Sequence, residues 1–150
     1  PVQRAIMPTP EIRENGLEDV LLLLPAIPEF ENTPSAADIV NRVVGVPHLI
    51  LTAYIDQQPC GFKIGYEREG VFYSWLGGVL PSYRRFGIAG KLADYQESWA
   101  ARHGYQKIWM KTRNRFPAML IMAVRRGFRI KGIVPREDIR EHRIVLEKSI

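Results

Sequence analysis

The segment Pro81–Leu92, PSYRRFGIAGKL, combines the residue types that bind phosphate groups. A strand is expected to end at Pro81, and a helix is expected to begin near Gly87. The first turn of a helix has unpaired N–H groups and a partial positive charge, which together attract anions. Basic and small side chains fill the segment: Arg84, Arg85, Gly87, Ala89, Gly90 and Lys91. The small residues leave room for a pyrophosphate near the backbone, and the basic residues add charge.

Basic residues are concentrated in the second half of the chain. The net charge is +5, but residues 1–83 carry five basic and ten acidic side chains, whereas residues 84–131 carry twelve basic and two acidic ones. The strongly basic segment 84–131 indicates a polyanionic partner, either nucleic acid or a phosphorylated cofactor. The acidic first half would repel nucleic acid and attract a cationic substrate, and the sequence lacks the aromatic interleaving of nucleic-acid-binding modules. We therefore expect a phosphorylated small molecule rather than nucleic acid.

Other residue types argue against several classes of protein. His48, His103, His142 and Cys60 lack the spacing of metal ligands, so we expect no bound metal. A single cysteine cannot form a disulfide within the chain, which fits a reducing compartment and a cytoplasmic location. The longest aliphatic run, Val20–Leu24, is too short to span a bilayer, so we expect no membrane partner. The sequence leaves open whether the chain forms a homodimer.

The order of the predicted elements is that of an α+β domain with a mixed sheet. Three central strands have connections too short for crossovers, so they are expected to be antiparallel neighbours. A helix then leads to a strand parallel to the third one. In chain order, the expected elements are strand Val2–Met7, helix Leu17–Leu24, a helix from 34 to about 44, strands His48–Ile55, Cys60–Glu67 and Val71–Leu80, helix Gly87–His103, strand Tyr105–Lys111, helix Pro117–Arg126, and strands Phe128–Val134 and Arg143–Lys148.

Two local signals refine this order. Thr33 is the expected N-cap of the second helix, with Pro34 at its first position. Gly77 and Gly78 interrupt the third central strand, and glycines inside a strand mark a bulge or the close approach of another backbone or a ligand. We therefore expect the end of this strand to form part of the site that the basic segment begins.

The region around the basic segment resembles the GNAT family of N-acetyltransferases. Residues 84–89, RRFGIA, match the family signature Q/R-x-x-G-x-G/A, and Trp75–Leu92 is similar to the family's strand, pyrophosphate loop and helix. Asn114 and Arg125–Phe128 are similar to its downstream asparagine and to a helix that ends in Gly-Phe. The resemblance implies that residues 1–150 form a single GNAT-like domain, in which helices flank a mixed, mostly antiparallel sheet. It also implies a transferase that uses acetyl-CoA.

The resemblance implies where acetyl-CoA would bind. A bulged strand near Gly77–Leu80 would pair with the pantetheine arm as an added strand would, and the free amide of Val79 would face the thioester carbonyl. The amides of Arg85–Gly90 would hold the pyrophosphate, and Asn114 would contact the pantetheine or adenine part. The cofactor-binding residues implied in this way are Gly78, Val79, Leu80, Arg84, Arg85, Phe86, Gly87, Ile88, Ala89, Gly90, Lys91 and Asn114.

The resemblance also implies that a primary amine, on a small cationic molecule or a lysine, attacks the thioester directly in a ternary complex. A lysine-like amine has an unperturbed pKa of about 10.4, so a base must take its proton first. As this base we choose Glu29, in the loop where the family's acceptor site forms. The alternatives are other carboxylates: Glu31, Asp38 and Glu67. Tyr73 and Trp75 are expected to line the acceptor pocket, although core packing explains Trp75 equally well.

One departure from the family pattern affects catalysis. Many members carry a tyrosine four residues before the glycine of Gly-Phe, where it serves as the acid for the thiolate. Here that position is Ala123, so a tyrosine acid is not supported. A non-catalytic module that binds or senses acyl-CoA on the same fold is therefore the alternative function.

Overall fold

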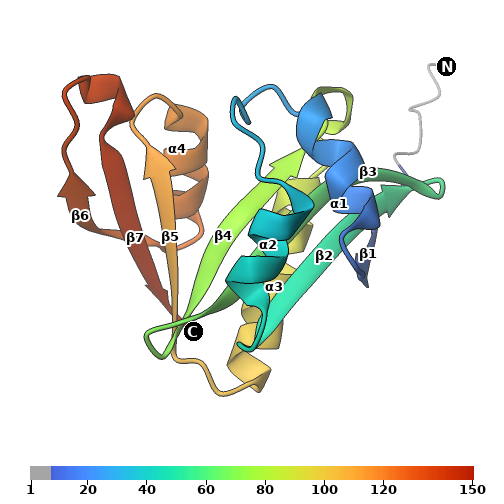
Figure 1. Ribbon diagram of the computed structural model, residues 1–150, viewed down its shortest axis with the longest axis horizontal. Coiled ribbons are helices and arrows are strands. Elements are labelled where there is room, and N and C mark those ends of the chain that lie inside the picture. The colour runs from blue at the N-terminus through green and yellow to red at the C-terminus, as the bar shows by residue number, and fades with distance from the viewer. Residues whose placement is uncertain (1–7) are drawn as a thin grey trace, which may run out of the picture. The chain divides into compact units, whose positions relative to one another are not determined.

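A computed structural model describes residues 8–150 as an α+β fold with a mixed sheet (Figure 1). Seven strands follow the order β1-β2-β3-β4-β5-β7-β6. β4 and β5 are parallel, whereas the pairs β1–β2, β5–β7 and β6–β7 are antiparallel, which confirms the expected fold class. The elements are β1 (Glu11–Glu14), α1 (Glu18–Leu23), α2 (Ala36–Val43), β2 (His48–Ile55), β3 (Gln58–Arg68), β4 (Val71–Val79), α3 (Ile88–Arg102), β5 (Lys107–Arg113), α4 (Pro117–Arg125), β6 (Arg129–Val134) and β7 (Arg143–Ser149).

Most elements begin and end within two residues of the predicted positions. The predicted strand Val2–Met7 lies outside the described residues, and β1 was not predicted. β1 has no apolar alternation of its own, and it is a strand because its backbone pairs with β2 from Glu11 opposite Tyr54 onward. β5 begins two residues later than predicted, because the amide of Tyr105 still donates to Ala100 O at the end of α3.

The predicted N-cap of α2 was wrong. Ser35, not Thr33, precedes the helix, and its hydroxyl accepts a hydrogen bond from the amide of Asp38 at 3.1 Å. The carboxylate of Asp38 accepts in return from the amide of Ser35 at 3.0 Å. This reciprocal capping box satisfies two backbone donors at once, whereas Thr33 has no acidic residue three positions later.

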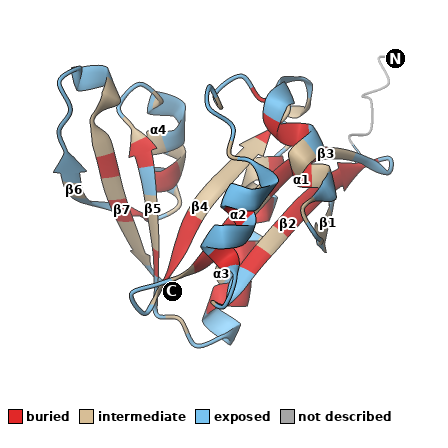
Figure 2. Ribbon diagram, viewed as in Figure 1, coloured by how far each residue is buried: buried red, intermediate tan, exposed pale blue. Residues whose placement is uncertain are grey.

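Contacts group the chain into two compact units, each with its own buried residues, which are red in Figure 2. Within the described residues, the first unit contains residues 8–64 and Leu76–Gln96, and the second contains Gly65–Trp75 and Glu97–Ile150. The largest fully buried apolar residues of the first are Val20, Leu24, Ile39, Leu51, Phe62, Ile64 and Ile88, and those of the second are Phe72, Ile108 and Leu146. That residues 1–150 act as a single domain stays a prediction.

None of the helices within residues 8–150 is both long and apolar enough to cross a membrane. The cytoplasmic location and the homodimer stay predictions.

Candidate functional site

The loop between β4 and α3 has the backbone conformation of an anion-binding site. After β4 the chain makes a 3₁₀ turn at Pro81–Tyr83 and passes through Arg84 in an extended conformation. Arg85 and Gly87 then have positive φ angles of 73° and 74°, whereas Phe86 between them does not. Residues whose φ angles alternate in sign turn successive N–H groups toward one concavity, which suits an anion. The left-handed conformation of a non-glycine residue such as Arg85 costs about 1–3 kcal/mol and is typical of functional loops.

The first turn of α3 adds unpaired N–H groups to this loop. The amide of Lys91 donates to Gly87 O at 3.1 Å, which is the first hydrogen bond of the helix. The amides of residues 88–90 therefore have no acceptor within the helix. Ile88 is 2% exposed, so its side chain anchors this turn in the core of the first unit. Of the amides predicted to hold a pyrophosphate, those of residues 88–90 thus belong to one well-anchored helix start.

The end of β4 presents backbone groups on the side away from β3. The amide of Leu80 donates to Cys60 O at 2.8 Å and so points toward β3. The carbonyl of Val79 belongs to the same trans peptide, points the opposite way, and accepts from Arg84 Nε at 3.2 Å. In an extended strand the N–H and C=O of one residue lie on the same side. The amide of Val79 therefore also points away from β3.

The hydrogen bond between Leu80 and Cys60 extends the pairing of β3 and β4 one residue past the end of β4. Near the turn, Arg68 and Val71 are the ends of the two strands. The bulge expected from the two glycines of β4 stays a prediction.

Gly78 allows the segment between α1 and α2 to pack closely on β4. A Cβ atom at Gly78 would lie 2.9 Å from Ile27 Cδ1 and 3.1 Å from Phe30 Cε2, which is closer than normal carbon contacts. The ring of Phe30 also packs on Phe62 of β3, with 5.9 Å between the ring centroids. Ile27 and Phe30 therefore fix the position of Glu29. Sequence analysis missed these two residues, although a glycine inside a strand was the signal that something approaches there.

Glu29 and Arg84, both expected at the functional site, form an ion pair with each other. Arg84 Nη2 lies 2.8 Å from Glu29 Oε2, and the two side chains are 42% and 39% exposed. The hydrogen bond from Arg84 holds the pKa of Glu29 below its ordinary value. An ion pair this exposed contributes about 1 kcal/mol or less to stability.

The acetyltransferase (GNAT) family model matches residues 20–133, which is well over half of the chain. The chain belongs to this acetyltransferase family. The match includes the whole of the loop and helix start that form the candidate anion site. No protein of curated function matches the sequence significantly.

Solved acetyltransferase structures share this fold at low sequence identity. The ribosomal-protein-S18-alanine N-acetyltransferase of Escherichia coli aligns with a TM-score of 0.79 and 17% identity over 95% of this chain and 94% of its own. Ard1 from Thermoplasma volcanium aligns with a TM-score of 0.78 and 17% identity over 94% and 97% of the two chains. The PaiA N-acetyltransferase of Thermoplasma acidophilum, solved in complex with coenzyme A, aligns with a TM-score of 0.73 and 16% identity over 95% of this chain and 99% of its own. At these identities the likeness shows the fold alone.

Three other residues expected at the acetyltransferase site lie in the second unit. The side-chain amide of Asn114, after β5, donates to Ile139 O at 3.1 Å. Tyr73 is 7% exposed and packs edge-on against Tyr66, with 5.5 Å between ring centroids. Trp75 contacts the same Tyr66 ring edge-on at 5.8 Å. These contacts are structural, and the cofactor and acceptor roles of Asn114, Tyr73 and Trp75 stay predictions.

Two of the alternative carboxylates have structural partners. Asp38 belongs to the capping box of α2. Glu67 accepts a hydrogen bond from the hydroxyl of Tyr105, and burial together with this bond raises the pKa of that hydroxyl. Glu31 is exposed in the segment before α2. Among residues 8–150, no group of three or more His, Cys, Asp or Glu side chains is placed to hold a metal ion.

Proposed function

We propose that the protein transfers the acetyl group of acetyl-CoA to a primary amine by direct attack within a ternary complex. The observation that carries this proposal is the combination, within one unit, of three sets of backbone donors. These are the concavity at Arg85–Gly87, the unpaired amides of residues 88–90 and the outward-facing amide of Val79. The first two suit a pyrophosphate, and the third suits a thioester carbonyl. Acetyl-CoA carries both groups in one molecule.

The pantetheine arm would extend along β4 and pair with the backbone of Gly78–Leu80 as an added strand. The amide of Val79 would then donate to the thioester oxygen, on which negative charge develops when the amine attacks. A preorganised donor at such an oxygen lowers the barrier by about 3–4 kcal/mol in other acyl-transfer sites. Lys91, beside the unpaired amides, would add charge attraction for the pyrophosphate, and Asn114 would contact the pantetheine or adenine part.

Glu29 is the proposed base for the amine, which belongs to a small cationic molecule or a lysine. While Arg84 holds Glu29, the lowered pKa makes this carboxylate a weak base. The pyrophosphate carries more charge than a carboxylate and competes for the exposed guanidinium. Once Arg84 turns to the pyrophosphate, the pKa of Glu29 rises toward its ordinary value of 4.5. Binding of the cofactor would in this way release the base.

Ala123 leaves the departing thiolate without a tyrosine acid. Ala123 is 2% exposed, and its methyl group has no acidic proton to donate. A thiol of this kind has a pKa of about 8–9, so its thiolate leaves readily and solvent can supply the proton. The same position supports the alternative function, a non-catalytic module that binds acyl-CoA.

Binding of the cofactor is tested by adding one carboxylate to the proposed pyrophosphate site. Ala89 and Ala37 are the second residues of α3 and α2, so Ala89→Asp and Ala37→Asp are matched. An aspartate in a first turn stabilises a helix by about 0.3–1 kcal/mol, so neither variant should lose stability. Calorimetric titration with acetyl-CoA should show affinity reduced about ten-fold or more in Ala89→Asp and unchanged in Ala37→Asp. Equal affinities of the two variants would refute the proposed site.

Catalysis is tested by release of free thiol from acetyl-CoA over a panel of primary amines. Glu29→Gln should lower turnover strongly, whereas Glu31→Gln, two residues away, should leave it near the wild-type value. Tight binding of acetyl-CoA without thiol release over the whole panel would favour the non-catalytic alternative.

A further inference from the structure

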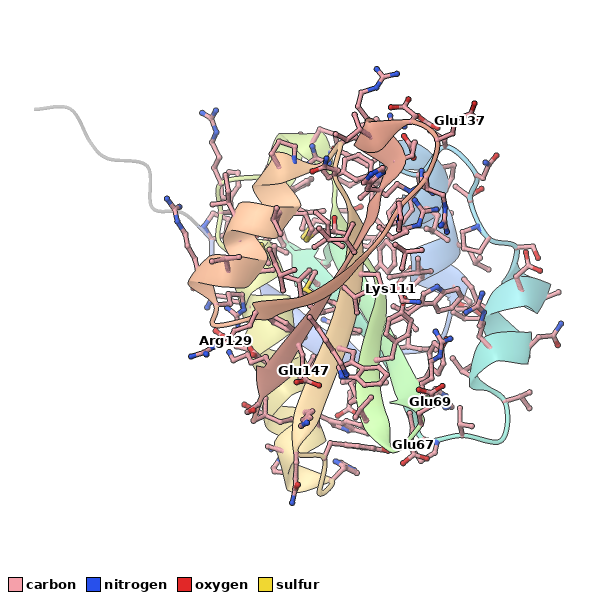
Figure 3. The ribbon with its side chains drawn as sticks, turned by 90° about the vertical axis from the view of Figure 1, so that its left-hand side faces the viewer. Glu67, Glu69, Lys111, Arg129, Glu137 and Glu147 are labelled. Atoms are coloured by element: carbon pink, nitrogen blue, oxygen red, sulfur yellow. The ribbon has the colours of Figure 1, made fainter. Side chains whose placement is uncertain are left out.

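The second unit contains a cavity of about 230 Å³ on the side of the sheet that carries Trp109 and Lys111. Figure 3 looks onto this side, with Lys111, Glu69 and Glu147 labelled. The rings of Tyr73 and Trp109 and the side chain of Val145 form its apolar walls. Its volume is below the roughly 300–1,000 Å³ of pockets for drug-sized ligands. It therefore has room for one small chemical group rather than for a large molecule.

Two cations in this cavity have no carboxylate partner. The guanidinium carbon of Arg68 lies 5.6 Å, and Lys111 Nζ 5.8 Å, from the centre of the Tyr73 ring. Within residues 8–150, neither Arg68 nor Lys111 forms a salt bridge. Each cation is attracted to the face of the ring, but two like charges beside one ring repel each other, and an anion between them would relieve this repulsion.

The other charges at the cavity leave it positive. Lys131 Nζ lies 4.0 Å from the centre of the Trp109 ring and 3.4 Å from Glu147 Oε1. Glu147 also pairs with Lys107 at 3.7 Å and accepts the indole N–H of Trp109 at 2.6 Å. Glu69 supplies the one carboxylate among the residues that line the cavity. Arg68, Lys111 and Lys131 therefore outnumber the acidic residues of the lining.

The positive charge continues along the same face of β5. Arg113 is two residues beyond Lys111, so both side chains point to the same face, and Arg113 is directly opposite Arg143 of β7. Like charges directly opposite each other destabilise a sheet. Glu141 lies 3.3 Å from Arg113, 3.9 Å from Arg143 and 3.1 Å from Arg115, so one carboxylate serves three guanidinium groups. The carboxylate of Glu141 thus partly neutralises these arginines.

We propose that the cavity binds a small acidic ligand whose carboxylate lies between Arg68 and Lys111. The apolar part of the ligand contacts Trp109 and Val145, which form the walls of the cavity. This binding goes beyond the acetyl transfer proposed above, because it requires neither the cofactor nor Glu29. It also counts against Tyr73 as a contact for a purely cationic amine, since both flanking side chains would repel such a group.

The test uses benzoate as the acidic probe and benzamide as its uncharged counterpart, in titrations at constant ionic strength. Binding is followed by nuclear magnetic resonance through the indole N–H signal of Trp109, assigned with a Trp109→Phe variant. We expect benzoate to shift this signal saturably and benzamide to bind at least about ten-fold more weakly, because it lacks the charge-assisted contacts. Inorganic phosphate, which has no apolar part, should also bind more weakly than benzoate.

The variants Lys111→Gln and Arg68→Gln should each weaken benzoate binding about ten-fold. Arg129→Gln is the matched control, because Arg129 is an exposed arginine of β6 that does not line the cavity. Thermal melting checks that all three variants are folded. Equal binding of benzoate and benzamide, tighter binding of phosphate than of benzoate, or an equal loss in Arg129→Gln would overturn the proposal.

Discussion

Replacing Gly78 by alanine should destabilise the protein, whereas the same change at the neighbouring Gly77 should not. A Cβ atom at Gly78 would lie 2.9 Å from Ile27 Cδ1 and 3.1 Å from Phe30 Cε2. At Gly77 the nearest atom would be Lys63 Cγ at 3.5 Å, an ordinary contact. Neither glycine has a positive φ angle, so the backbone accepts alanine at both positions. The two variants therefore differ in packing alone.

The expected magnitudes follow from these distances. Alanine inside a strand is favoured over glycine by about 0.5–1 kcal/mol, which Gly77→Ala should gain. At Gly78 the added carbon is well inside the optimum separation of about 3.5–4.0 Å. Ile27 is 2% exposed, so its terminal methyl group has little room to move aside. Overpacking of this kind costs about 1–3 kcal/mol, so Gly78→Ala should be destabilising overall.

Urea unfolding of both variants and the wild type measures this difference as a change in midpoint at constant slope. Since Ile27 and Phe30 also fix the position of Glu29, Gly78→Ala should reduce thiol release more than Gly77→Ala does. If both variants are equally stable, or if Gly77→Ala is the less stable one, the close packing of the 27–30 segment on β4 is refuted.

Three further predictions concern single side chains. Ser35→Ala should lower the free energy of unfolding by about 1 kcal/mol through loss of the α2 cap, whereas Thr33→Ala should leave it unchanged in the same urea experiment. Burial raises the pKa of the Cys60 thiol to about 11. A thiol reagent at pH 8 should therefore label Cys60 only in the unfolded protein. Rapid labelling of the folded protein would contradict the burial of Cys60. Arg84→Gln should raise the pKa of Glu29 toward 4.5, measured by carboxyl resonance titration. The folded pKa of Glu29 lies below its unfolded value. The stabilisation from its pair with Arg84 is therefore present above about pH 4.5 and is lost as the pH falls through the folded pKa. If the pKa of Glu29 is the same in wild type and variant, the two side chains are not paired.

The sequence predicted most of the fold because the elements with strong local patterns also have strong tertiary roles. The range predicted for β2 coincides with the observed one, since nearly every residue of HLILTAYI is apolar and the strand is buried. β1 could not be predicted in the same way. Its four residues, EIRE, become a strand only through backbone bonds to β2, which a local pattern does not contain.

The cap of α2 shows a different kind of error. Thr33 and Ser35 are both common N-cap residues. Pro34 favours Thr33, because proline is common at the first position of a helix. The residue that decides is Asp38, three positions after Ser35, whose carboxylate completes the capping box. This signal is present in the sequence, and it outweighs the proline that follows Thr33.

The candidate site was only partly predictable. The positive φ angles at Arg85 and Gly87 belong to a short segment whose composition is distinctive, so an anion-binding loop could be recognised from it. The contact between Arg84 and Glu29 joins residues far apart in the chain and depends on how Ile27 and Phe30 pack against Gly78. Tertiary packing of this kind leaves no local pattern in the sequence.

The pairing of Arg84 with Glu29 has a kinetic consequence for the proposed reaction. The carboxylate of Glu29, which would accept the proton, lies 2.8 Å from Arg84 Nη2 and stays paired until another anion binds this guanidinium. Acetyl-CoA should therefore enter before the amine, in a compulsory order. An unreactive analogue of the amine should then inhibit uncompetitively against acetyl-CoA, and Arg84→Gln should relax this order. A single contact between residues 55 positions apart would thus determine the sequence in which the two substrates enter.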